Sequence, residues 1–94
     1  MILRIVKMSF DPSKVNEFLA LFEESRLFIA GFNGCKELRL LKDNDRNNVY
    51  FTYSLWDSLD HLEEYRKSGL FNTVWSRTKI LFNDKPQAWS MPYE

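Results

Sequence analysis

The chain has 94 residues, and its 13 Lys and Arg balance its 13 Asp and Glu, so the formal net charge is zero. A chain of this length has no room for two independent hydrophobic cores, and we expect one domain spanning residues 1–94. Without net positive charge, the protein has no long-range attraction for nucleic acid or for an anionic membrane surface, and we expect neither as a partner.

One histidine and one cysteine are too few for a metal site of nitrogen and sulfur ligands, which usually takes roughly three or four side chains. Three scattered glycines form no phosphate-binding loop. We therefore expect no metal and no cofactor. Arg4 and Lys7 interrupt the first ten residues, so no apolar segment there suits a signal peptide, and we expect a cytoplasmic protein without a membrane span.

The first half of the chain predicts a strand, a helix and a turn. Residues 2–10 begin with apolar, β-branched residues and interleave polar ones, as a half-buried strand does. Asp11 can cap the helix that follows, and Pro12 suits its first turn. Apolar residues then recur at helical spacing as far as Ile29, after which the glycines of AGFNGC let the chain turn back.

The second half predicts two strands, a helix and a last strand. Strands are expected at residues 35–42 and 49–56, because the polar segment DNDRNN between them suits a hairpin loop. The following helix should break or kink at Gly69, and residues 87–93 can form an edge strand. The order β-α-β-β-α-β predicts an α+β protein with a ferredoxin-like antiparallel sheet and its helices on one face.

The other face of this sheet would be left uncovered. Along residues 49–56 one of the two alternating sets of side chains contains Tyr50, Thr52, Ser54 and Trp56. We assign this set to the uncovered face, where it is too aromatic to be plainly solvated. A second copy could cover it, sheet against sheet, which predicts a homodimer.

The single histidine, His61, has two interpretations. It could be a general base or a hydrogen-bond donor beside an aromatic pocket. It could also be an ordinary first-turn residue near the helix caps Asp57 and Ser58, and spacing alone favours this. A nucleophile set of Ser58, Asp60 and His61 is disfavoured, since they share one helical turn and no oxyanion hole is marked.

Four aromatic residues near His61 also have two interpretations. Each alone occupies a position where core packing is the default, but together they could line a pocket for a small aromatic molecule. They are Trp56, Tyr65, Phe71 and Trp75. The RNA-recognition fold shares the predicted element order, but residues 47–54 lack the glycine and the basic start that its third strand carries.

Three segments carry a resemblance to a known family: GFNGCKELRLLKD, the strand ending at Trp56, and WDSLDHLEEY. In this order and at this length, the chain resembles the antibiotic biosynthesis monooxygenase (ABM) family of the dimeric α+β barrel superfamily. The resemblance implies homodimers whose sheets form a barrel, with a pocket between sheet and helices. Several members oxidise quinols or anthrones with molecular oxygen and without metal or flavin.

The resemblance also suggests roles for single residues. Trp56 matches a strand-end Trp, and His61 matches a His of the quinol-oxidising members, which implies a proton acceptor. Tyr65 stands where those members often have a second His, and Thr52 where the anthrone-oxidising members have an Asn. With Phe71 added from the aromatic set above, the candidate substrate-binding residues are Thr52, Trp56, Tyr65, Phe71 and Trp75. Haem degradation is disfavoured, because Tyr65 and Trp75 occupy the places of that branch's Trp and iron-ligating His.

Two functions follow as hypotheses. The first is a cofactor-independent monooxygenase of ABM type that acts on a small phenolic or quinol-like substrate with O2. The second is a non-catalytic module with the same dimeric fold that binds or senses a small molecule.

Overall fold

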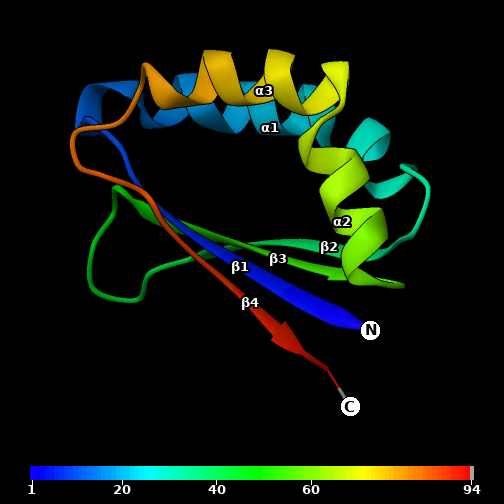
Figure 1. Ribbon diagram of the computed structural model, residues 1–94. Helices are drawn as coiled ribbons and strands as arrows, with labels where there is room; N and C mark the ends of the chain where they lie inside the picture. Colours follow the sequence, from blue (N-terminus) through cyan, green and yellow to red (C-terminus); the bar gives the residue numbers. More distant parts are fainter. Residues whose placement is uncertain (94) are drawn as a thin grey trace.

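A computed structural model describes residues 1–93, so the last residue of the predicted domain lies outside the described part. Its elements are β1 (Ile2–Ser9), a 3-10 turn η1 (Pro12–Lys14), α1 (Val15–Ala30), β2 (Cys35–Lys42), β3 (Val49–Trp56), α2 (Leu59–Arg66), α3 (Gly69–Lys79) and β4 (Gln87–Pro92). Figure 1 shows the helices on one face of the sheet and the other face open.

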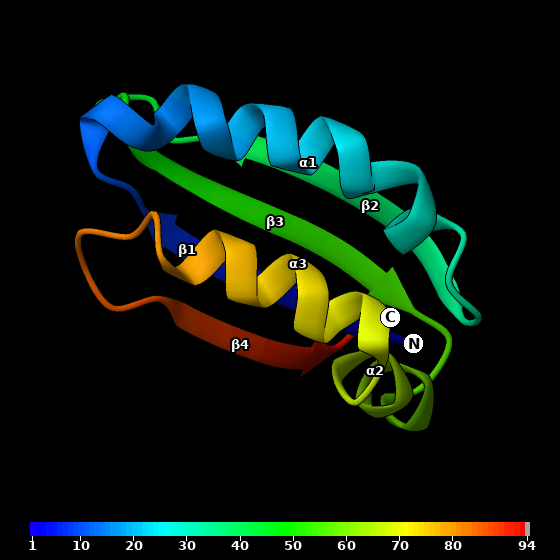
Figure 2. The ribbon, with the colours of Figure 1, turned by 90° about the horizontal axis from the view of Figure 1, so that it is seen from above.

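The sheet has the strand order β2-β3-β1-β4, and each neighbouring pair is antiparallel. Viewed from above, α1 runs over β2 and β3, α3 runs over β1 and β4, and α2 lies near one end of the sheet (Figure 2). The predicted ferredoxin-like α+β fold is confirmed. Within the described residues, no helix has the length and apolar character needed to cross a membrane.

The predicted break at Gly69 is confirmed as the start of a separate helix. The Ser68 Oγ accepts a hydrogen bond from the Phe71 backbone N–H at 3.1 Å and donates one to the Tyr65 carbonyl at 2.6 Å. Ser68 therefore ends α2 and caps α3 with the same hydroxyl group, as a helix N-cap does.

A cluster of buried apolar side chains packs between the sheet and the helices. Phe10 is fully buried and stacks on Phe18, with ring centroids 4.1 Å apart. The rest of the buried cluster is Met8, Phe22, Tyr50 and Leu81. Because Phe10 is fully buried, its truncation to Ala would lower the free energy of unfolding by about 3–5 kcal/mol.

The predicted assignment of the two sheet faces is wrong. Tyr50 and Trp56 are buried, and the set containing them faces the helices. Alternation defines two sets of side chains but does not say which set lies beneath the helices. The open face instead carries the set of Phe51 and Tyr53, next to three exposed apolar side chains: Leu41, Trp89 and Met91.

Candidate functional site

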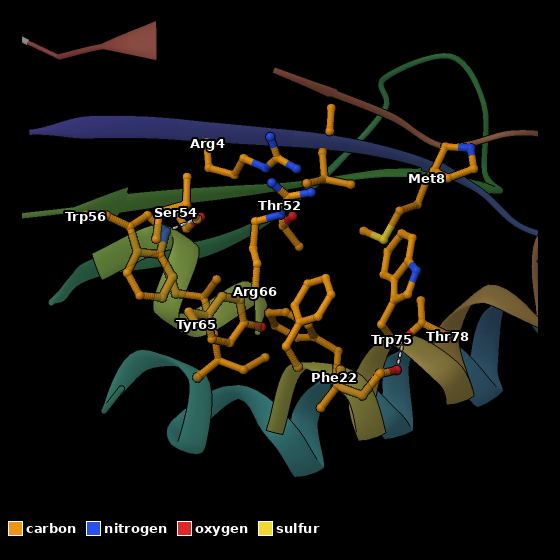
Figure 3. A pocket seen from close by; sticks show the side chains of 18 of the residues that line it. Arg4, Met8, Phe22, Thr52, Ser54, Trp56, Tyr65, Arg66, Trp75 and Thr78 are labelled. Carbon is orange, nitrogen blue, oxygen red and sulfur yellow. Dashed lines mark hydrogen bonds between the residues drawn. The ribbon is translucent and has the colours of Figure 1, made fainter. Parts of the chain in front are cut away.

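A cavity of about 360 Å³ lies between the sheet and the helices, and three residues of the buried cluster, Met8, Phe18 and Phe22, line part of it (Figure 3). Its floor includes the short inward side chains of Thr52, Ser54 and Ala88. Because these side chains fill little space, the floor leaves room beneath the helices. The volume falls within the range of small-molecule sites, roughly 300–1,000 Å³.

A continuous run of aromatic rings forms one wall. Trp56 at the end of β3 stacks on Tyr65 of α2, with centroids 4.9 Å apart and planes at 26°. Tyr65 meets Phe71 of α3 edge-on at 5.3 Å, and Phe71 stacks on Trp75 at 5.9 Å. Each ring restricts its neighbour, so the wall is rigid and suited to a planar ligand.

The polar groups of the cavity are few. The Trp56 indole Nε1–H donates to the Ser54 Oγ at 3.0 Å, which fixes both buried groups on the floor. The Tyr65 hydroxyl points toward the middle of the cavity (Figure 3). Burial, and to a smaller extent the nearby Cys35, raises the pKa of Tyr65. The phenol therefore stays protonated near neutral pH and can donate a hydrogen bond to a ligand.

Two arginines also line the cavity. Arg4, on β1, pairs in register with Ser54 and Ser90, and its Nη1 donates to the Ser90 Oγ at 2.9 Å. Arg66, at the end of α2, forms an ion pair with Glu63, at 3.1 Å. Burial and the neighbouring positive charge of Arg66 lower the pKa of Arg4, and Glu63 partly opposes this.

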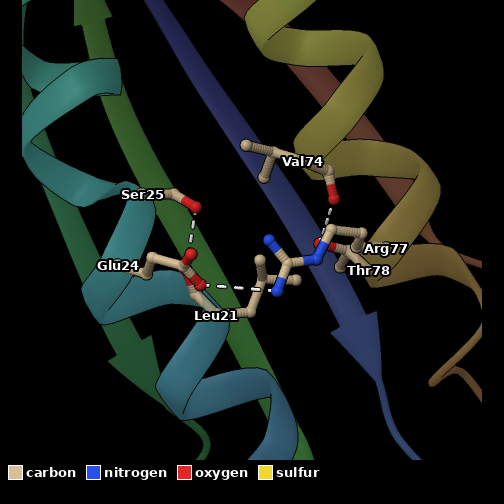
Figure 4. Close-up of polar contacts among 6 residues, drawn as sticks. All are labelled: Leu21, Glu24, Ser25, Val74, Arg77 and Thr78. Carbon is tan, nitrogen blue, oxygen red and sulfur yellow. Dashed lines mark hydrogen bonds and ion pairs between the residues drawn. The ribbon is translucent and has the colours of Figure 1, made fainter.

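The walls are held by polar contacts within and between α1 and α3 (Figure 4). The buried hydroxyls of Ser25 and Thr78 donate to carbonyl groups one turn earlier in their own helices, at 2.8 and 2.7 Å. These bonds leave no orphaned hydroxyl where the helices face the interior. Arg77 of α3 forms an exposed ion pair with Glu24 of α1 at 3.4 Å, outside the cavity lining.

His61 lies at the start of α2 and is not among the residues that line the cavity. Its Nδ1 is 2.7 Å from the Ser58 Oγ, and its backbone N–H donates to the same oxygen at 3.2 Å. Its ring packs on Gly34 so closely that a Cβ there would lie 2.4 Å from the His61 Cγ. The structure thus places His61 at a helix cap, and its role as a proton acceptor stays a prediction.

The structure brings the five other predicted site residues together. Thr52, Trp56, Tyr65, Phe71 and Trp75 all line the cavity. That they bind a substrate stays a prediction.

Sequence reasoning missed the two arginines. Strand alternation places Arg4 on the same face as Val6 and Met8, and helical spacing places Arg66 one turn from Leu62. The available signal was a positively charged side chain, Arg4 or Arg66, at a position where the neighbouring residues of the same face are apolar.

Metal ligands and an activated thiol are not evident in the described part of the chain. Residues 1–93 contain no group of three or more His, Cys, Asp or Glu that could hold a metal ion. Cys35 is half-buried, and burial raises the pKa of its thiol. The thiol is therefore protonated at neutral pH, which disfavours a nucleophilic role.

Comparison with known families identifies one family whose sequence profile matches this chain. The sequence profile described as antibiotic biosynthesis monooxygenase matches residues 1–74, from β1 into the middle of α3. The chain belongs to the ABM family. It is therefore a member of a monooxygenase family in general terms. No curated protein matches the sequence.

Solved structures share the fold of this ABM protein. A crystal structure of an antibiotic biosynthesis monooxygenase has a TM-score of 0.92 and 14% identity, with 100% of this chain and 99% of that chain covered. A conserved protein from Methanosarcina mazei Go1 also reaches 0.92, at 16% identity, covering 100% and 94%. SnoaB, a cofactor-independent oxygenase from Streptomyces nogalater solved as a point mutant, reaches 0.83 at 17% identity, covering 98% and 91%. At such identities, the likeness concerns the fold alone.

Proposed function

We propose that this ABM protein is a cofactor-independent monooxygenase that oxidises a small phenolic or quinol-like molecule with O2 in the cavity between sheet and helices. The observation that carries the proposal is the aromatic wall from Trp56 to Trp75, which borders a cavity with few polar groups. The description of SnoaB as a cofactor-independent oxygenase, for a protein of the same fold, supports it.

The reaction needs no external reductant. A hydroquinone and O2 give a hydroxyquinone and water: one oxygen atom enters a ring carbon, the other leaves as water, and the substrate supplies all four electrons. Loss of a phenolic proton makes the ring electron-rich enough to pass an electron to O2. The protein would contribute a dry aromatic slot and hydrogen bonds to the anion.

Within the cavity, the residues divide this work. Phe71 and Trp75 would hold the substrate ring between apolar surfaces and exclude water. The Tyr65 hydroxyl, kept protonated by burial, would donate a hydrogen bond to oxygen that gains negative charge. His61, which does not contact the cavity, remains a predicted proton acceptor only.

A homodimer is part of the proposal. Leu41, Trp89 and Met91 are 45%, 45% and 39% exposed on the open face of the sheet, where a second copy would bury them. The cytoplasmic location expected from the sequence also stays a prediction.

Oxygen consumption with a panel of substituted hydroquinones tests the function. We expect uptake above the rate of autoxidation for at least one compound, and a loss of about tenfold or more in Phe71→Ala, which opens the wall. Phe28→Ala is the matched control, because Phe28 is 69% exposed on α1 and should leave uptake unchanged. A hydroquinone that binds without any uptake would contradict the proposal and favour the non-catalytic binding module.

A further inference from the structure

Arg4 and Arg66 are the charged residues that line the cavity, and the proposed oxidation gives neither of them a role. Both side chains reach into the cavity, with their guanidinium groups next to each other near Thr52 (Figure 3). Each guanidinium group carries five N–H donors. The structure assigns one acceptor to each group, the Ser90 hydroxyl for Arg4 and the Glu63 carboxylate for Arg66.

This arrangement is costly unless it has a counter-charge. Arg4 occupies an inward position on β1, where it is half-buried, and the like charge of Arg66 disfavours its ionised form further. Within residues 1–93, the ion pairs include no carboxylate within 4.0 Å of Arg4. Two cations against the single carboxylate of Glu63 leave this end of the cavity positive.

We infer that the Arg4–Arg66 end of the cavity binds a phenolic substrate as its phenolate anion. The charged oxygen accepts hydrogen bonds from the two guanidinium groups, and the ring lies along the aromatic wall. Charge-assisted hydrogen bonds of this kind are short and about twice as strong as neutral ones. The inference deepens the proposed function, and its catalytic consequence rests on that function.

The consequence is that binding itself ionises the substrate. A positive pair close to a phenolic oxygen favours the charged form and lowers the pKa of the bound phenol. Besides the two arginines, the one titratable residue among residues 1–93 that lines the cavity is Tyr65, which is protonated, and Glu63 pairs with Arg66. The bound substrate would thus become the oxidisable anion at neutral pH without a dedicated base in the cavity.

4-Nitrophenol is a suitable probe, because its anion absorbs visible light and it does not need to react with O2. Titration from acid to alkaline pH, with and without saturating protein, gives the pKa of the free and the bound phenol. For the wild type, we expect a drop of about one pKa unit, a tenfold shift in the ionisation equilibrium. Arg4→Gln and Arg66→Gln should each lose most of this shift.

Arg77→Gln is the matched control, since it removes an exposed arginine whose ion pair with Glu24 lies outside the cavity lining (Figure 4). It should keep the wild-type shift. The inference is overturned if wild-type protein leaves the pKa of 4-nitrophenol unchanged or raises it, a result that needs no variant. It is also overturned if the probe does not bind, or if folded Arg4→Gln and Arg66→Gln both behave like the wild type.

The proposed function can fail separately. A lowered pKa of bound 4-nitrophenol without oxygen uptake from any hydroquinone would uphold the anion site and contradict the monooxygenase. Oxygen uptake that survives both arginine substitutions, together with an unchanged pKa of bound 4-nitrophenol, would uphold the monooxygenase and contradict the anion site.

Discussion

At the scale of single residues, the contact between Gly34 and His61 joins the α1–β2 turn to the start of α2. Gly34 has a φ of +89°, which side-chain-bearing residues rarely adopt, and its Cα faces the His61 ring. The turn can therefore pack against the helix only while this position lacks a Cβ.

We expect Gly34→Ala to lower the free energy of unfolding by about 2 kcal/mol or more, because it combines backbone strain with a steric clash. Gly69→Ala is the control, since its new Cβ would meet nothing within 4 Å at the start of α3, and it should be neutral or slightly stabilising. Denaturant unfolding measures both. Equal stabilities for the two variants would contradict the described packing of His61.

Tyr65 should make stability depend on alkaline pH. Its pKa is raised in the folded protein, so its contribution is complete below the unfolded value of ~10 and is lost as pH rises above it. Above about pH 10, the free energy of unfolding of the wild type should fall more steeply with pH than that of Tyr65→Phe, by up to about 1.4 kcal/mol per pH unit. Parallel curves would show that Tyr65 is not shifted.

At the scale of elements, Ser68 connects the two rings in the middle of the aromatic wall. Its hydroxyl bonds to the backbones of Tyr65 and Phe71, so it fixes the angle at which α2 meets α3. We expect Ser68→Ala to cost about 1 kcal/mol of stability, as the loss of an N-cap usually does. It should also weaken ligand binding in the cavity.

Ser76→Ala is the control for Ser68, because Ser76 is exposed in the middle of α3, where Ala is a good helix former. Thermal unfolding and 4-nitrophenol binding can be measured on both variants. If Ser68→Ala has the same stability and the same affinity for 4-nitrophenol as Ser76→Ala, the Ser68 cap does not shape the cavity.

The sequence predicted the elements well because local signals define them. Period-2 and period-3.6 patterns, the DNDRNN loop and the break near Gly69 all act over a few residues. The choice of sheet face was wrong because it depends on packing between elements that are distant in the chain. Tyr50 and Trp56 lie beneath the helices since large aromatic rings fill that layer, and alternation alone does not express this.

The site was predictable only in part, because some of its features follow from local spacing and others depend on packing between distant elements. The aromatic wall follows from strand-end and helical spacing, whereas the cavity depends on short side chains of β3 and β4, which lie on either side of β1 and line the cavity beneath the helices. Arg4 looked like an ordinary polar strand residue until the face of β1 was known. His61 matches a histidine of the family, but its ring packs against Gly34 at the start of α2 and does not line the cavity.

At the scale of the whole molecule, the open sheet face predicts self-association. We expect the wild type to sediment as a dimer at micromolar concentration and Leu41→Asp to shift it toward monomer, because a buried unpaired charge is costly. Leu27→Asp is the control: Leu27 is 80% exposed on α1, away from the open face. A monomeric wild type would contradict the sheet-to-sheet dimer.

The proposed function requires that O2 reacts with the substrate in the cavity without the help of a cofactor. The most direct test is turnover of a hydroquinone under ¹⁸O₂ with protein that has been freed of metals and flavin, followed by mass spectrometry of the product. We predict one labelled oxygen atom in the hydroxyquinone, formed faster than by autoxidation, and a loss of this product in Phe71→Ala. An unlabelled product, or labelling at the same rate without protein, would contradict the proposed monooxygenase activity.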